Sequence, residues 1–262
     1  MRINANGIDI DYDVSGTDDG PVVVLSHSLG SSRVMWDPQM PALEAAYRVV
    51  SYDTRGHGGS SAPAEAYSLD QLGDDAMALL DALEIESAHW VGLSMGGMIG
   101  QNLALRQNGR LDSLVLCDTS AQIPAEARST WDDRIAAADS GGMAPLAEPT
   151  LERWFTPDYL GGDPPAVAPI RQQFLDTPPA GFIGCCHALK PLDYLDRLGE
   201  IRLPTLIIVG EDDPGTPVAA SEAMHERIAG SELAILPSAA HLSNIEQADA
   251  FNQALLGFLD GR

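Results

Sequence analysis

The sequence predicts an α/β fold, in which a mostly parallel sheet is covered on both faces by helices. The main observation is that short apolar runs, typical of strands buried on both faces, alternate with helical segments along most of the chain. Such an order favours right-handed crossovers and a parallel sheet. A second observation is that this alternation stops between about residues 120 and 200. With 262 residues, the chain can form one large domain carrying an insertion.

Strands and helices can be assigned in order from these patterns. The expected strands cover residues 8–14, 22–25, 48–52, 111–117, 204–209 and 233–236, with another at 88–91 that leads into Gly92. The expected helices cover residues 38–46, 68–83, 98–106 and 244–259, with another beginning at Pro217. Ser68-Leu69-Asp70-Gln71 has the pattern of a capping box at a helix start.

The segment between residues 120 and 200 has a different character. Proline and glycine divide it into short amphipathic pieces at 125–139, 143–154, 165–175 and 180–189, and it carries several Trp, Phe and Tyr side chains. We therefore expect residues 1–120 and 201–262 to form the α/β core. Residues 121–200 are expected to form a helical cap over the carboxyl edge of the sheet.

Ser94 is the candidate nucleophile. Gly92-Leu93-Ser94-Met95-Gly96 follows an apolar strand and precedes a helix, which is the setting of a nucleophile elbow. The tight turn strains the backbone at Ser94, so Gly92 and Gly96 are needed where a Cβ would clash. In a chain this rich in glycine the motif arises by chance in on the order of one chain in ten, so its partners decide its meaning.

Those partners are expected at the ends of two later strands. Gly210-Glu211-Asp212-Asp213 supplies the acid, for which Asp213 is favoured and Asp212 is the alternative. Ser238-Ala239-Ala240-His241 supplies the base. A serine hydroxyl needs a base within hydrogen-bond reach that a third group orients, and the order Ser, Asp, His suits an elbow fold.

Two backbone N–H groups are expected to form an oxyanion hole. One belongs to Met95, the residue after the nucleophile, and the other to Leu29 in the loop after strand 22–25. His27 and His57 lie on loops at the same sheet edge, and either could contact substrate. No histidine pair has the spacing of metal ligands, so neither a metal nor another cofactor is expected. The three cysteines form no disulfide framework and are expected to be buried.

Composition excludes several partners. The net charge of -23 repels nucleic acid and anionic membranes, and it opposes an anionic substrate unless arginines reverse the local potential. The apolar runs are too short to span a bilayer, and the first residues lack the apolar stretch of a secretory signal. We therefore expect a cytoplasmic protein that acts on a small molecule. The sequence does not give its oligomeric state.

Taken together, these motifs resemble the α/β-hydrolase superfamily over the whole chain. Within it, the chain resembles the branch of 3-oxoadipate enol-lactonases, which act in the breakdown of aromatic compounds. That resemblance is carried by Leu25-Ser26-His27-Ser28-Leu29-Gly30, Asp53-Thr54-Arg55-Gly56-His57-Gly58, the elbow, Arg153-Trp154-Phe155-Thr156 and His241-Leu242-Ser243-Asn244-Ile245-Glu246. One departure is His27, at a position where this branch is expected to have Asn.

The resemblance implies hydrolysis of a lactone that carries a free carboxylate. Arg134 and Arg153 in the cap are the candidate cations for that carboxylate, although a surface salt bridge would also explain either residue. Trp154 is expected to pack the cap on the core and to line the pocket. The alternatives are a carboxylesterase or other lactonase with the same machinery, and a hydrolase-fold protein that binds a ligand without turnover.

Overall fold

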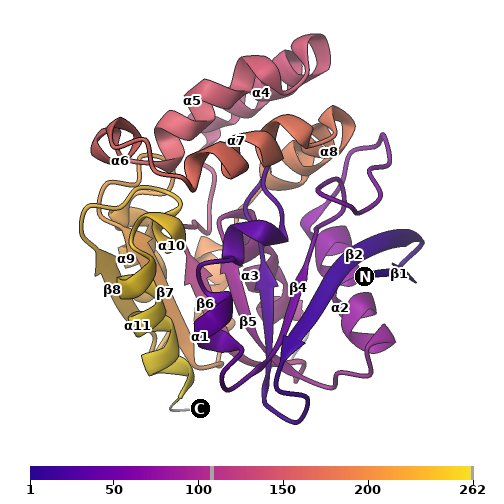
Figure 1. Cartoon of the computed structure of the whole chain (residues 1–262), viewed down its shortest axis with the longest axis vertical. Coiled ribbons are helices and arrows are strands. Elements are labelled where there is room, and N and C mark those ends of the chain that lie inside the picture. The colour runs from indigo at the N-terminus through magenta and orange to yellow at the C-terminus, as the bar shows by residue number, and fades with distance from the viewer. Residues whose placement is uncertain (107–108, 261–262) are drawn as a thin grey trace.

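The computed structural model describes residues 1–106 and 109–260 and confirms the α/β class (Figure 1). Eight strands form one sheet in the order β1-β2-β4-β3-β5-β6-β7-β8. They are β1 (Arg2–Ala5), β2 (Ile8–Gly16), β3 (Val22–Ser26), β4 (Arg48–Tyr52), β5 (Ala88–Leu93), β6 (Leu111–Cys117), β7 (Thr205–Gly210) and β8 (Glu232–Leu236). Strands β1 and β2 pair antiparallel, β2 pairs antiparallel with β4, and the remaining pairs are parallel.

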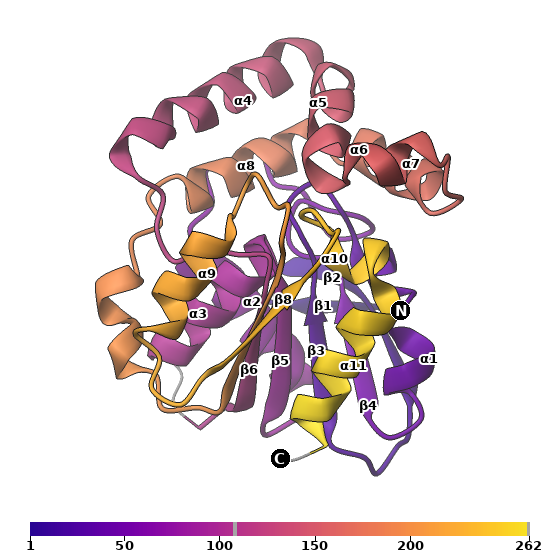
Figure 2. The ribbon, with the colours of Figure 1, turned by 90° about the vertical axis from the view of Figure 1, so that its left-hand side faces the viewer.

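Helices cover both faces of this sheet (Figure 2). Those of the core are the 3₁₀ helix η1 (Arg33–Trp36) and the α-helices α1 (Met40–Leu43), α2 (Leu69–Ala82), α3 (Met95–Arg106), α9 (Val218–His225), α10 (Ser243–Glu246) and α11 (Ala248–Leu259). Helices α2, α3 and α9 lie on one face, and α1 and α11 lie on the other. Strands β5 and β7 are buried along their whole length, because helices cover them from both sides.

Most of the segment 121–200, residues 125–189, lies above the carboxyl edge of the sheet (Figures 1 and 2). The segment contains η2 (Ala125–Ala127), α4 (Arg128–Gly141), α5 (Ala144–Trp154), α6 (Pro157–Gly161), α7 (Val167–Asp176) and α8 (Pro179–Leu189), and it ends with the 3₁₀ helix η3 (Leu195–Glu200), which contacts α3 and α9 of the core. Its two ends run side by side, since Ile123 N–H donates to the Leu192 carbonyl and Tyr194 N–H to the Ala121 carbonyl. These bonds support the division into core and cap, which stays a prediction. We call residues 121–200 the cap.

The structure differs from the expected elements in several places. Strand β1 precedes the first expected strand and joins β2 through Asn6 and Gly7, which both have positive φ. The helix expected over 38–46 is only α1, because Pro41 has no N–H with which to continue an earlier helix. The closing helix is divided at Gln247, whose φ of -125° and ψ of 51° are not helical.

All three cysteines are buried and unpaired. In the described part of the chain, no helix has the length and apolar character that crossing a bilayer requires.

Candidate active site

Ser94 lies at the sharp turn between β5 and α3, with φ of 55°. This left-handed conformation is strained for a residue with a side chain. A Cβ on Gly92 would lie 2.2 Å from the Gly96 carbonyl oxygen, and one on Gly96 would lie 2.1 Å from the Ser26 carbonyl oxygen. The two glycines therefore allow the turn to form. Helix α3 begins at Met95, directly after Ser94, rather than at residue 98 as expected.

Asp213 and His241 come together as the sequence predicts. His241 Nδ1 lies 2.7 Å from Asp213 Oδ2. The same carboxylate accepts hydrogen bonds from the N–H groups of Gly215 and Thr216 and from the Thr216 hydroxyl. The alternative acid, Asp212, is exposed, whereas Asp213 is buried. The geometry therefore favours Asp213 as the partner of the histidine.

Burial alone would raise the pKa of Asp213, but the charge and hydrogen bond of His241, with the bonds from Thr216, outweigh it and lower that pKa to about 2. For His241, burial opposes the charged form, yet Asp213 raises the pKa above its ordinary value of 6.5. The pair is thus an ionised carboxylate beside an imidazole that can accept a proton. This is the electrostatic arrangement of a general base held by an acid.

Asp118, at the end of β6, is a buried carboxyl that sequence reasoning missed. It accepts hydrogen bonds from Gly210 N–H over 2.8 Å and from the Ser243 hydroxyl over 2.5 Å. Burial, together with the nearby charge of Asp213, raises the pKa of Asp118 to about 8. Asp118 thereby connects the end of β7 to the chain that follows His241.

The two N–H groups expected to form the oxyanion hole are not used in hydrogen bonds to other described protein groups. Within the described residues, the N–H of Leu29 makes no hydrogen bond to another protein group. The N–H of Met95 opens helix α3 and so has no acceptor within the helix. Both N–H groups are therefore available to a ligand oxygen near Ser94.

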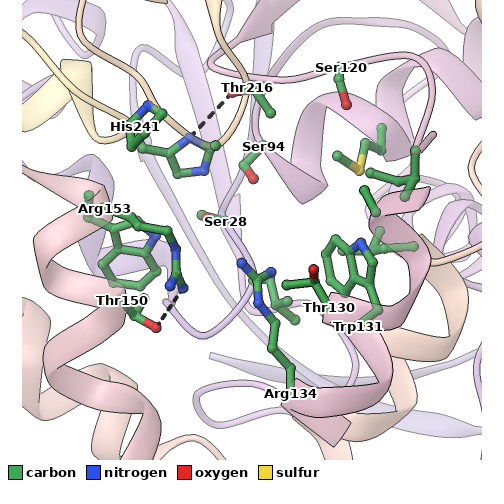
Figure 3. Close-up of a pocket in the computed structure, with 18 of the residues that line it drawn as sticks. Ser28, Ser94, Ser120, Thr130, Trp131, Arg134, Thr150, Arg153, Thr216 and His241 are labelled. Carbon is green, nitrogen blue, oxygen red and sulfur yellow. Dashed lines mark hydrogen bonds between the residues drawn. The ribbon is translucent and has the colours of Figure 1, made fainter. Parts of the chain in front are cut away.

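A cavity of about 490 Å³ lies between the core and the cap. Its wall includes the expected site residues Ser94, His241, Leu29, Arg134, Arg153 and Trp154. Figure 3 shows the His241 ring directed toward Ser94, with a dashed line from its Nδ1 to the Thr216 hydroxyl. A volume of this size and a wall that is largely apolar with a few polar groups are typical of a small-molecule site.

Arg134 and Arg153 direct their guanidinium groups into this cavity (Figure 3). Arg153 Nη2 donates to Thr150 Oγ1 over 3.1 Å, and the Arg134 guanidinium lies 4.8 Å from the centre of the Trp131 ring. In the described residues, neither arginine forms an ion pair with a carboxylate. Burial, with the nearby charge of Arg134, lowers the pKa of Arg153 to about 10. Both groups stay charged at neutral pH.

The expectation for His27 needs correction. Its ring is fully buried, is not part of the cavity wall, and has both nitrogens engaged by backbone groups, Nδ1 with the Ser28 carbonyl and Nε2 with Thr54 N–H. His57 is likewise buried outside the cavity. The sequence placed both on the correct loops but could not show which way their side chains point.

Trp154 combines both expected roles. The residue is 4% exposed, and its ring lines the cavity and packs edge-on against Phe174 of α7. Two further wall residues, Trp131 and Thr150, were missed. Each precedes a cavity arginine by three residues, the spacing that puts two side chains on one helix face. This spacing in the sequence could have identified Trp131 and Thr150 as neighbours of the two arginines in the cavity wall.

Comparisons with known proteins show the family to which this chain belongs. Residues 21–159 match the family described as alpha/beta hydrolase fold. A 3-oxoadipate enol-lactonase of Acinetobacter baylyi is 38% identical over 97% of this chain and 94% of its own. The crystal structure of the enol-lactonase from Burkholderia xenovorans superposes with a TM-score of 0.96 at 38% identity, covering 99% of this chain and 100% of that one.

A hydrolase of Pseudomonas aeruginosa also superposes, with a TM-score of 0.95 at 40% identity, covering 99% of this chain and 97% of its own. These similarities confirm the expected fold and the resemblance to enol-lactonases. They also confirm the expectation of a hydrolase. The chain therefore belongs to the α/β-hydrolase family.

Proposed function

We propose that this protein hydrolyses a carboxylate-bearing enol-lactone, most specifically 3-oxoadipate enol-lactone, through an acyl-enzyme formed on Ser94. The single observation that carries the choice of a carboxylate-bearing substrate is the presence of two half-buried arginines that face the cavity without a carboxylate partner in the described residues. A cation in such a position is costly unless an anion joins it. A substrate carboxylate supplies that anion.

The proposed reaction has two steps. His241 Nε2 takes the Ser94 proton while Ser94 Oγ attacks the lactone carbonyl, and Asp213, bound at Nδ1, stabilises the imidazolium. The N–H groups of Leu29 and Met95 hold the oxyanion. Collapse of the tetrahedral intermediate breaks the ring C–O bond, and the enol oxygen leaves with the proton from His241. Water, activated by His241, then attacks the acyl-enzyme and releases the free acid.

The arginine pair also answers the electrostatic problem set by the net charge of -23. Far from the site, the acidic surface opposes an anionic substrate. Inside the cavity, two neighbouring guanidinium groups reverse the local potential, and a low dielectric strengthens their attraction for a carboxylate. Two hydrogen bonds to a charged group contribute about 1.5 to 3 kcal/mol each.

Turnover of 3-oxoadipate enol-lactone, compared with p-nitrophenyl acetate, tests this function. The wild-type protein is expected to prefer the enol-lactone strongly in kcat/KM, and Ser94→Ala is expected to abolish both activities. A preference for the neutral ester would favour a general carboxylesterase and overturn the enol-lactone assignment while keeping the triad. Tight binding of the enol-lactone with no Ser94-dependent turnover on either compound would favour a binding protein.

A further inference from the structure

His27 contacts the carbonyl oxygen of the peptide group that joins Ser28 to Leu29. His27 Nδ1 lies 2.7 Å from the Ser28 carbonyl oxygen. That carbonyl and the N–H of Leu29 belong to one planar trans peptide, so they point in opposite directions. Whatever fixes the Ser28 carbonyl therefore also fixes the direction of the Leu29 N–H.

The other nitrogen of the ring assigns the position of the proton. His27 Nε2 accepts a hydrogen bond from Thr54 N–H over 2.9 Å, so it carries no proton itself. In a neutral ring the proton is then on Nδ1, where it is donated to the Ser28 carbonyl. Burial lowers the pKa of His27 to about 4, which keeps the ring neutral in ordinary buffers.

His57 binds the next peptide group, which joins Leu29 to Gly30, through its N–H group rather than through its carbonyl. Its Nε2 accepts a hydrogen bond from Gly30 N–H over 2.9 Å, and its Nδ1 lies 3.3 Å from the Arg55 carbonyl. Gly30 has φ of 77°, so the backbone here depends on glycine to turn toward the ring. The centres of the two rings lie 5.1 Å apart, so the rings pack against each other.

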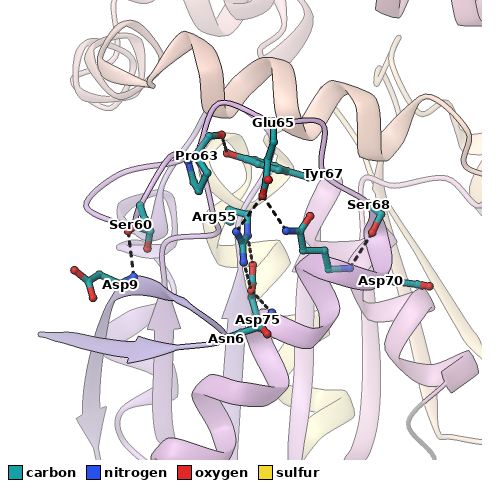
Figure 4. Close-up of polar contacts among 12 residues, drawn as sticks. Asn6, Asp9, Arg55, Ser60, Pro63, Glu65, Tyr67, Ser68, Asp70 and Asp75 are labelled. Atoms are coloured by element: carbon teal, nitrogen blue, oxygen red, sulfur yellow. Dashed lines mark hydrogen bonds and ion pairs between the residues drawn. The ribbon is translucent and has the colours of Figure 1, made fainter.

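The loop that carries His57 is itself rigidly braced (Figure 4). The Arg55 guanidinium donates two hydrogen bonds of 2.7 Å to the Asp75 carboxylate of α2, and this pair is almost fully buried. Asn6 adds a third bond to the same carboxylate. The loop also contacts the cap closely, because a Cβ on Gly56 would lie 2.6 Å from the Cα of Gly181 in α8. These contacts therefore fix the position of the loop that carries His57.

We propose that His27 and His57 are positioning residues that aim the Leu29 N–H at the oxyanion. This inference rests on the proposed function, which assigns that N–H to the oxyanion hole. His27 fixes the peptide that bears the donor, and His57 fixes the peptide that follows it. Neither ring touches the substrate, and neither exchanges a proton with it.

Matched substitutions separate this role from simple packing. In His27→Asn, the amide nitrogen occupies the place of Nδ1 and can still donate to the Ser28 carbonyl, whereas His27→Leu has a similar shape without a donor. In His57→Gln, the amide oxygen can still accept from Gly30 N–H, whereas His57→Met has a similar length and only a weak acceptor. Thermal unfolding of all four variants verifies that each is folded.

Hydrolysis of p-nitrophenyl acetate is the first readout, because this ester needs no cavity arginine and so does not depend on the enol-lactone assignment. We expect His27→Leu and His57→Met to lower kcat at least about tenfold with little change in KM, a loss smaller than the 10²- to 10³-fold effect of deleting a donor. His27→Asn and His57→Gln are expected to recover most of it. Inhibition by an arylboronic acid, whose Ser94 adduct mimics the oxyanion, should weaken in parallel with kcat/KM.

Hydrogen–deuterium exchange of residues 26–32 is the second readout and needs no turnover. Exchange is expected to accelerate in His27→Leu and His57→Met and to stay slow in His27→Asn and His57→Gln. Equal loss of kcat in matched variants, or full kcat and unchanged exchange in folded His27→Leu, would overturn the inference. Failure of the proposed function gives a different result. Turnover would then persist in Ser94→Ala, or the wild-type protein would show no turnover. Hydrogen–deuterium exchange of residues 26–32 would still show whether His27 and His57 hold this loop.

Discussion

The backbone N–H of Leu242, next to His241, donates to the carbonyl oxygen of Trp154, next to Arg153, over 2.9 Å. This bond joins the loop of the candidate base directly to the cap segment that faces the cavity. Glu246 reinforces the connection, since its carboxylate accepts from Ala240 N–H and from both the N–H and the hydroxyl of Thr156. The position of the base and the position of the cap arginine are therefore set by one cluster of contacts.

Replacing Glu246 should disturb both sides of this connection. In Glu246→Gln, the amide NH₂ group would face backbone and hydroxyl donors, so we expect a loss of about 1 to 3 kcal/mol in the free energy of unfolding and a higher KM for the enol-lactone. Chemical denaturation and steady-state kinetics measure the two effects. Glu222→Gln, at an exposed position of α9, is the matched control. Equal unfolding free energies and equal KM values in the two variants would show that Glu246 does not connect the loop of the base to the cap.

Substitution of the cavity arginines should affect a charged substrate alone. We expect Arg153→Met and Arg134→Met each to lower kcat/KM for the enol-lactone by about 10- to 100-fold, the worth of a hydrogen bond to a charged group. Activity on p-nitrophenyl acetate should change little. Arg171→Met, at a half-exposed position of α7 outside the cavity, is the control. Equal losses on both substrates would show that the arginines do not recognise a carboxylate.

The pH profile should report His241. The ring must be neutral to accept the Ser94 proton, so kcat/KM should fall as the pH drops through the raised pKa of His241, above 6.5. Asp213→Asn removes the charge that raises this pKa, and kcat should fall by about 10⁴-fold. Asp212→Asn, at an exposed position, should leave the profile in place. An acid limb that shifts in Asp212→Asn instead would reassign the acid.

The buried histidines should make the fold sensitive to acid. Burial lowers the pKa of His27 from 6.5 to about 4, so the unfolded chain binds a proton that the folded chain does not. The stability that this neutral ring confers is complete above pH 6.5 and is lost as the pH falls toward 4, at about 1.4 kcal/mol per pH unit.

In His27→Asn this contribution is absent. The decrease in unfolding free energy between pH 7 and pH 4.5 should therefore be smaller than in the wild type by roughly 2 to 3 kcal/mol. Urea denaturation at the two pH values measures it. An identical decrease in both proteins would mean that His27 is not held neutral in the folded state.

Local sequence patterns predicted the parts of the site that local structure controls. The elbow at Ser94 follows from glycine spacing between a strand and a helix, and the strand-end positions of Asp213 and His241 follow from the order of apolar runs. Patterns of this kind also predicted most elements of the core. In the cap they missed α6, which has only five residues. Short elements leave little periodicity to detect.

Contacts between distant segments were beyond the same reasoning. Thr156 and Glu246 are 90 residues apart in the chain, and nothing in either segment predicts their hydrogen bond. The side chain of His27 was misassigned for a related reason. Its loop position is local, but the direction of its ring depends on the backbone of Thr54, which belongs to another loop. Packing between loops decides which polar side chains reach the cavity.

The identity of the nucleophile is tested most directly by covalent trapping. Incubation with a fluorophosphonate, followed by intact-protein and peptide mass spectrometry, should show one adduct per chain on Ser94, formed much more slowly in His241→Ala and Asp213→Ala than in the wild type. Asp212→Ala should react at the wild-type rate. Labelling of Ser94→Ala at the wild-type rate, or an adduct on any other residue, would contradict the account.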